Sequence, residues 1–177
     1  MTRRTGPKID LPTRVALLRI VFGVLWAIDA WLKWQPAFFS GYLGYLQDAA
    51  TGQPAYLTPW FDFWQTLVGL NPVLFAVVTA ITETLIAGGL ILGLARRLDY
   101  VAGFVFSLLV WSTAEGFGGP YTAGSTDIGA AVIYAVVFAA LYGLDELAGS
   151  ARLAVDPLIA RRWPAWRFLA GPGSTRP

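Results

Sequence analysis

The chain has 177 residues, of which 56% are hydrophobic, 15% aromatic and only 14% charged. A soluble domain of this length normally carries about a quarter charged residues, so this much apolar surface indicates an integral membrane protein. The net charge of +2 argues against nucleic-acid binding. Because the chain has neither cysteine nor histidine, it lacks the usual ligands of haem, iron-sulfur clusters and zinc, and we expect no metal site.

Four segments are long and apolar enough to cross a hydrocarbon layer about 30 Å thick, which takes about 20 helical residues. They lie near residues 14–34, 71–95, 99–118 and 127–147. The first segment has no small-residue cleavage site, so we interpret it as a retained helix and not as a signal peptide. The predicted fold is all-α: an integral membrane four-helix bundle formed by residues 1–150.

The basic residues predict the orientation of this bundle. They precede the first helix, separate the second from the third, and follow the fourth: Arg3, Arg4, Lys8, Arg14, Arg96, Arg97, Arg152, Arg161, Arg162, Arg167 and Arg176. The segments 35–70 and 119–126 contain no lysine or arginine. Because Lys and Arg accumulate in cytoplasmic loops, both termini are expected in the cytoplasm.

Two segments outside the predicted helices are rich in aromatic residues. Residues 35–70 predict one or two short interfacial helices on the extracytoplasmic side, which form either an aromatic belt or a lid over a ligand. Residues 151–177 mix arginine with Trp and Phe around prolines. This composition predicts a cytoplasmic segment that lies on anionic membrane lipid and ends in a disordered tail.

Several acidic residues fall inside the predicted spans, where a charge is costly and usually functional. At 1.5 Å per residue, Asp29, Glu83 and Glu115 lie about 20 to 24 Å above the cytoplasmic ends of their helices. Lys33 lies one turn above Asp29, the spacing at which an acid and a base on one helix meet. Asp127 is placed at the outer start of the fourth helix. The sequence therefore predicts an acid-rich pocket in the outer half of the bundle.

Each of these acids also has a simpler explanation. Asp127 follows "GST" and could only cap the fourth helix. Asp29 could only neutralise Lys33, whose side chain can also reach the interface. Glu115 is placed in the last turn of the third helix, where the helix dipole opposes a carboxylate, so it is expected to be protonated or paired with Lys33. Glu83 has no water to reach and is expected to pair or to retain a proton.

Two further features lie in the cytoplasmic half of the predicted bundle. Arg19 lies about 8 Å above the cytoplasmic end of its helix, and its side chain is expected to reach either the inner headgroups or Glu83. Gly89 and Gly93 form a GxxxG spacing, which indicates close helix packing.

Three stretches resemble the DoxX superfamily and, within it, the DoxD-like branch. They are "LLRIVFGVLWAIDAWLKWQP", "ETLIAGGLILGLARR" and "WSTAEGFGGPYTAGSTDIGAAVIYAVVF", and together they span most of residues 17–140. The resemblance implies a four-helix bundle in the cytoplasmic membrane of a bacterium or archaeon. It also implies a role like that of DoxD, the membrane subunit of a thiosulfate:quinone oxidoreductase, which works with a second subunit, DoxA.

The residues and the resemblance together suggest a quinone as ligand, because a quinone needs an aromatic slot, hydrogen-bond donors and acids that supply protons. Glu115 and Asp127 are the expected proton-handling pair, with Glu83 as a third catalytic acid. The expected ligand-binding residues are Asp29, Lys33, Trp34, Trp111, Tyr121 and Tyr134. A redox partner subunit would supply the electrons. The alternatives are a small-molecule or proton-coupled transporter and a non-catalytic scaffold for a partner protein.

Overall fold

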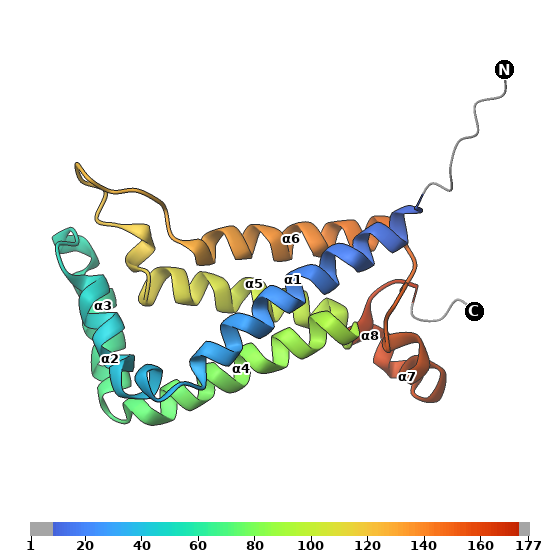
Figure 1. Ribbon diagram of the computed structural model, residues 1–177, viewed down its shortest axis with the longest axis horizontal. Coiled ribbons are helices and arrows are strands. Elements are labelled where there is room, and N and C mark those ends of the chain that lie inside the picture. The colour runs from blue at the N-terminus through green and yellow to red at the C-terminus, as the bar shows by residue number, and fades with distance from the viewer. Residues whose placement is uncertain (1–8, 174–177) are drawn as a thin grey trace, which may run out of the picture.

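A computed structural model describes residues 9–173 of the chain (Figure 1). Within this range the protein consists of eight α-helices, joined by loops and short 3-10 turns, and contains no strand. The helices are α1 (Leu11–Lys33), α2 (Pro36–Ala50), α3 (Thr58–Gly69), α4 (Pro72–Leu92), α5 (Arg96–Thr113), α6 (Ala130–Ala148), α7 (Asp156–Arg162) and α8 (Arg167–Ala170). The predicted all-α class is therefore confirmed for the described residues.

Three of these helices, α1, α4 and α6, are long and apolar enough to cross a membrane. Large apolar side chains remain exposed along them, including Leu25, Leu85 and Val136. Such a surface is stable in lipid and not in water, so the protein is a multi-pass membrane protein. The remaining long helix, α5, has 18 residues and begins with Arg96 and Arg97.

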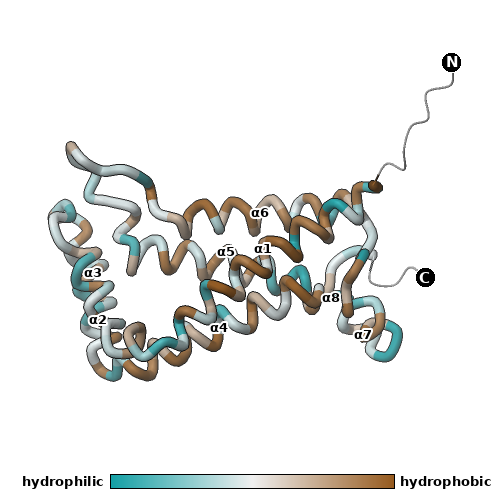
Figure 2. Tube along the Cα trace, viewed as in Figure 1, coloured by the Kyte–Doolittle hydropathy of each residue, from teal (hydrophilic) through white to brown (hydrophobic). Residues whose placement is uncertain are grey.

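The four long helices form two pairs, α1 with α4 and α5 with α6 (Figure 1). Helices α2 and α3 lie across one end of these helices, which we call the cap end. Helices α7 and α8 lie at the opposite end, near the start of α5, and we call it the tail end. Figure 2 shows hydrophobic residues along α1, α4 and α6, with more hydrophilic stretches at both ends.

Local signals explain where the first two long helices begin. The side chain of Asp10 accepts a hydrogen bond from the Thr13 amide, and Asn71 does the same for Leu74. In both helices a proline occupies the first turn, where its missing N–H costs nothing. Helix α4 ends at Leu92, and the next residue, Gly93, has a φ of 63°, a left-handed conformation that commonly terminates a helix.

The predicted bounds of the last two long helices are wrong at the cap end. Helix α5 ends at Thr113 and not near residue 118, because the chain turns through Gly116 and Gly118 with φ values of 56° and 73°. Helix α6 begins at Ala130 and not at Asp127, because Gly129 has a φ of 88°. Asp127 therefore lies in the loop before the helix.

The core of the bundle is aromatic. The ring of Phe138 packs edge-on against Phe22 and Trp26, with centroids 5.0 and 5.3 Å apart. Leu90 and Leu141 complete this layer and are fully buried. The layer fills the middle of the bundle and separates the polar groups of the cap end from those of the tail end.

The segment predicted to be an interfacial anchor and a disordered tail contains two short helices, α7 and α8, the second of which ends at Ala170. Helices α7 and α8 fold back toward the start of α5. Arg3, Arg4, Lys8 and Arg176, which entered the predicted orientation, lie outside the described residues, as does the last part of the predicted disordered tail.

Candidate functional site

Lys33 joins two helices through its ammonium group. Its Nζ lies 2.9 Å from Asp29 Oδ2 on the same helix and 3.3 Å from Glu83 Oε2 on α4. Glu83 is only 3% exposed, whereas the Lys33 side chain is 22% exposed, so the pair has one buried and one half-buried partner. The expected contact between Asp29 and Lys33 is present, and Glu83 is the second acid that Lys33 meets.

Glu115 occupies a different environment from the expected one. It follows the end of α5, and its Oε2 accepts a hydrogen bond from the Ala131 amide at 3.0 Å, in the first turn of α6. Among the described residues Lys33 pairs with Asp29 and Glu83 and not with Glu115. The predicted conflict with a helix dipole is thus wrong, because the carboxylate lies at the favourable, positive end of α6.

Asp127 acts within the loop that precedes α6. Its Oδ1 accepts a hydrogen bond from the Gly129 amide at 2.8 Å, and the residue is exposed. Trp111 fixes the same loop, because its indole N–H donates to the Ile128 carbonyl at 2.8 Å. Gly129 is required at this point, since a Cβ there would overlap the Glu115 carboxylate.

A small cavity, which we call the polar cavity, brings the acids together. It has a volume of about 170 Å³ and lies between α1, α4, α5 and the start of α6. Its polar lining residues are Asp29, Lys33, Glu83, Ser107, Glu115 and Tyr134. Five of the nine residues predicted to form the site therefore surround one space.

A larger space, which we call the apolar cavity, lies beneath α2 and α3 and has a volume of about 500 Å³. Its aromatic lining comes from α2, α3, α4 and α5 and includes Phe38, Tyr42, Tyr45, Trp64, Phe75 and Phe106. Lys33, Glu83, Phe106 and Val110 line both this cavity and the polar cavity. The ion pair therefore lies in the wall between an aromatic space and a polar one.

Tyr42 places a hydroxyl group in the wall of the apolar cavity. Its oxygen lies 2.8 Å from Thr79 Oγ1, in a hydrogen bond that either group can donate. Burial raises the pKa of the Tyr42 phenol above its ordinary value, so the phenol keeps its proton. The Lys33 ammonium also lies over the Phe38 ring, 5.7 Å from its centroid.

A third space opens to the surface at the cap end, and we call it the surface hollow. It measures about 580 Å³ and is lined by Glu115, Gly118, Gly119, Asp127, Gly129, Ala130 and Ile133. Glu115 and Ala130 line both this hollow and the polar cavity. Asp127 lines the hollow and is absent from the lining of the polar cavity.

Three of the predicted ligand-binding residues lie outside the two cavities. Trp34 donates its indole N–H to Thr84 Oγ1 at 3.0 Å and is largely exposed. Tyr121 is 65% exposed and donates to the Phe117 carbonyl. Trp111 supports the Ile128 loop instead of lining a cavity.

Sequence reasoning missed the aromatic residues of α2 and α3 as pocket-forming residues. The aromatic composition of residues 35–70 was the available signal, and a lid over a ligand was one of its two interpretations. The structure places Tyr42 and Trp64 in the cavity wall. It also ties α3 to α5, because the Trp60 indole donates to the Ser112 carbonyl at 2.8 Å.

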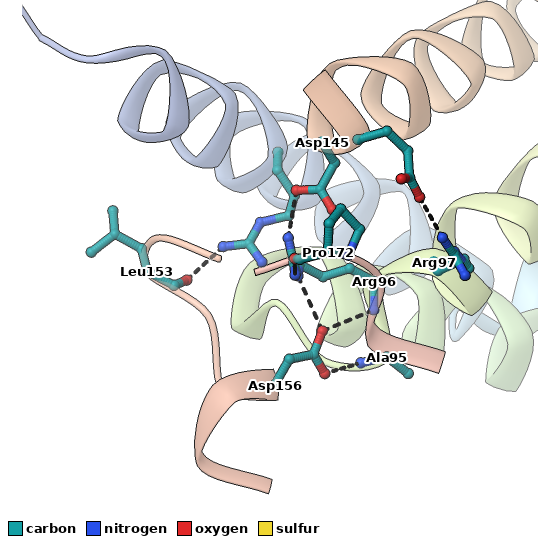
Figure 3. A network of polar contacts seen from close by, with 9 residues as sticks. Ala95, Arg96, Arg97, Asp145, Leu153, Asp156 and Pro172 are labelled. Atoms are coloured by element: carbon teal, nitrogen blue, oxygen red, sulfur yellow. Dashed lines mark hydrogen bonds and ion pairs between the residues drawn. The ribbon is translucent and has the colours of Figure 1, made fainter. Parts of the chain in front are cut away.

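A second polar cluster lies at the tail end and was not predicted (Figure 3). The Arg96 side chain is buried between two carboxylates, with Nη1 2.5 Å from Asp145 Oδ1 and Nε 3.1 Å from Asp156 Oδ2. The Asp156 carboxylate, which is 0% exposed, also accepts hydrogen bonds from the Ala95 amide and the Trp166 indole. This cluster attaches α7 and α8 to the bundle.

Arg19 belongs to the tail-end cluster and follows neither of its two expected paths. Its Nη2 donates to the Leu153 carbonyl at 2.5 Å, and the residue is almost completely buried. It therefore reaches neither solvent nor Glu83. Among the described residues, no group of three acidic side chains lies close enough to hold a metal ion.

Comparison of the chain with protein-family models, with curated proteins and with solved structures finds no match.

Proposed function

We propose that the protein is the quinone-binding membrane subunit of an oxidoreductase, and that the apolar cavity holds the quinone ring. In this proposal α1, α4, α5 and α6 all cross the membrane, with the tail end in the cytoplasm and the cap end on the outer side. The single observation that carries the proposal is the pair of half-buried Lys33 and buried Glu83 in the wall of an aromatic cavity.

The charge distribution supports this orientation. At the tail end the described chain carries Arg14, Arg96, Arg97, Arg152 and the arginines of α7 and α8. The cap-end segments 35–70 and 119–126 contain no lysine or arginine. Because basic residues are retained on the cytoplasmic side, the tail end is assigned there.

The size and lining of the apolar cavity support a ligand with an aromatic or quinonoid ring. Pockets for small molecules and cofactors measure about 300 to 1,000 Å³ and combine apolar walls with a few directed polar groups. This cavity has a volume of about 500 Å³. Its polar lining residues include Lys33, Tyr42 and Thr82.

Lys33 is suited to contact a quinone carbonyl. An ammonium group has three N–H donors, and the two carboxylates within ion-pair distance of it, Asp29 and Glu83, can engage at most two of them at a time through the oxygens that face it. The third is free to donate to a ligand oxygen in the apolar cavity. Reduction of a quinone to a quinol takes two electrons and two protons, so Glu83 stands where a proton has to be supplied. A redox partner subunit supplies the electrons.

The resemblance of residues 17–140 to the DoxX superfamily supports the same class of function. It suggests thiosulfate as the electron source and a DoxA-like partner. These two assignments rest on the resemblance alone.

A proton-coupled transporter is the second candidate, because the surface hollow adjoins the polar cavity through Glu115. The aromatic layer of Phe22, Trp26 and Phe138 fills the bundle below the cavities, which favours a binding site closed on that side. Flux of a substrate or of protons into liposomes that contain this protein alone would favour the transporter.

Binding of a short-chain quinone to the purified protein tests the proposal. We compare the wild type with Lys33→Met/Glu83→Gln, which removes the ion pair without leaving an uncompensated charge at Glu83. Loss of a hydrogen bond from a charged donor costs about 1.5 to 3 kcal/mol, so binding weakens about tenfold to a hundredfold.

The matched control is Glu146→Gln, which removes the exposed ion pair with Arg97 at the tail end and is expected to leave binding unchanged. Mass spectrometry of lipids extracted from the wild type provides the direct complement. A preparation free of quinone that also fails to bind the added short-chain quinone would refute the proposed function.

A further inference from the structure

The proposed function uses the apolar cavity and leaves the polar cavity unexplained. Ser107 Oγ lines the polar cavity, and this residue is only 1% exposed. Its hydroxyl has no hydrogen-bond partner among the described residues. Buried polar groups without a protein partner are usually met by ordered water, and about 170 Å³ accommodates several water molecules.

The three spaces adjoin one another in a fixed order. Glu115 and Ala130 form the boundary between the surface hollow and the polar cavity. Lys33 and Glu83 form part of the boundary between the polar and the apolar cavity. Carboxylate groups therefore stand at both ends of the polar cavity, and Asp29 and Ser107 lie along its wall.

The opposite direction is closed by side chains. Below the polar cavity Trp26 contacts Phe138 and Phe22, and Leu90 and Phe138 are fully buried. Water that enters the polar cavity thus has its shortest way out through the cap end.

We propose that the polar cavity holds water continuous with the surface hollow, and that this water carries protons from the cap-end surface past Glu115 to Glu83. Each transfer breaks one O–H bond, of a hydronium ion or of a protonated carboxyl group, and forms one on the next water molecule or carboxylate, and no electron moves. The delivery of these protons to a quinone rests on the proposed function, whereas the presence of the water path does not.

The natural absence of cysteine makes a direct test possible, because a single introduced thiol can be labelled without background. Ser107→Cys places a thiol in the polar cavity with little change in volume. Val105→Cys is the matched control on the same helix, since Val105 is exposed on the lipid-facing side. Ala123→Cys, in the exposed loop before α6, marks the side of the membrane on which the hollow opens.

The membrane-embedded full chain is treated with 2-aminoethyl methanethiosulfonate on the side that labels Ala123→Cys, with a thiol scavenger on the other side. Because only the hydrated thiolate reacts, Ser107→Cys is expected to react at least about tenfold faster than Val105→Cys. Adding Ala130→Leu, which narrows the boundary between hollow and polar cavity, is expected to slow that reaction by about tenfold.

Ser107→Cys that reacts no faster than Val105→Cys would overturn the water path. Equal rates with and without Ala130→Leu would overturn its entry past Glu115. Quinone binding is measured on the same preparations, so the two proposals can fail separately. Loss of labelling with quinone still bound contradicts only the water path, and fast labelling of a protein that binds no quinone contradicts only the proposed function.

Discussion

At the scale of single residues, glycines make room for charged and aromatic side chains inside the bundle. A Cβ at Gly89 would overlap the Asp99 carboxylate, and one at Gly93 would overlap the Arg19 guanidinium. The GxxxG spacing of these two residues indicates close helix packing. The structure adds a second role, because the two glycines make room for the buried side chains of Asp99 from α5 and Arg19 from α1.

Gly103 offers the clearest test of such close packing. Its helix passes directly against the Phe138 ring, and an added Cβ would overlap that ring. Gly103→Ala is therefore expected to lower the unfolding free energy by about 1 to 3 kcal/mol, the usual cost of overpacking a core. Tryptophan fluorescence during thermal unfolding in detergent measures the change.

The matched control for this variant is Gly88→Ala. Gly88 lies within α4, and a Cβ there would meet no atom within 4 Å. Alanine stabilises a helix interior relative to glycine by about 0.5 to 1 kcal/mol, so the control should melt at the same or a higher temperature. If Gly103→Ala and Gly88→Ala unfolded at the same temperature, the close packing of Phe138 against Gly103 would be contradicted.

At the scale of elements, helix α6 receives its N-terminal cap from a residue outside the helix. The residue before α6, Gly129, has no side chain that could cap the helix. Instead, the Glu115 carboxylate accepts a hydrogen bond from the Ala131 amide. Because Glu115 follows the end of α5, this bond fixes the pairing of α5 and α6 at the cap end.

Removal of this cap is expected to destabilise the protein. Glu115→Ala should lower the unfolding free energy by about 0.5 to 2 kcal/mol, as for other helix caps, whereas Glu115→Gln keeps an acceptor oxygen and should cost less. Thermal unfolding of the purified variants shows whether Glu115→Ala is destabilised more than Glu115→Gln. Asp127→Ala, which affects only an exposed loop contact, is the control, and a larger loss for it than for Glu115→Ala would reverse the assigned roles.

The tail helices provide the second prediction at this scale. Asp156 attaches α7 to Arg96 and to the Ala95 amide, and removal of one partner of a buried ion pair costs about 3 to 5 kcal/mol. Asp156→Asn is therefore expected to release α7 and α8 and to speed trypsin cleavage after Arg161 and Arg162. The control Glu146→Gln removes only an exposed pair with Arg97 and should be cleaved at the wild-type rate. A similar rate for both variants would show that Asp156 does not hold the tail.

At the scale of the whole molecule, two polar clusters occupy opposite ends of an apolar bundle. The convergence of Asp29, Lys33 and Glu83 could be predicted, because hydropathy locates the helices and a constant rise per residue gives the depth of each side chain. The apolar cavity could not be predicted from the sequence, because Tyr42 and Trp64 line it only as a result of how α2 and α3 lie across the cap end. The pair of Arg96 and Asp156 joins residues 60 apart in the chain, a contact that no local pattern encodes.

The central claim is that a quinone occupies the apolar cavity beneath α2 and α3. Photolabelling of the membrane-embedded protein with an azidoquinone, followed by mass spectrometry of the labelled peptides, tests it most directly. The label is expected on cavity-lining residues such as Tyr42, Trp64 and Thr82, and excess unlabelled quinone should abolish it. Labelling confined to the lipid-facing residues Val21, Leu25 and Val136, or unaffected by competing quinone, would contradict the account.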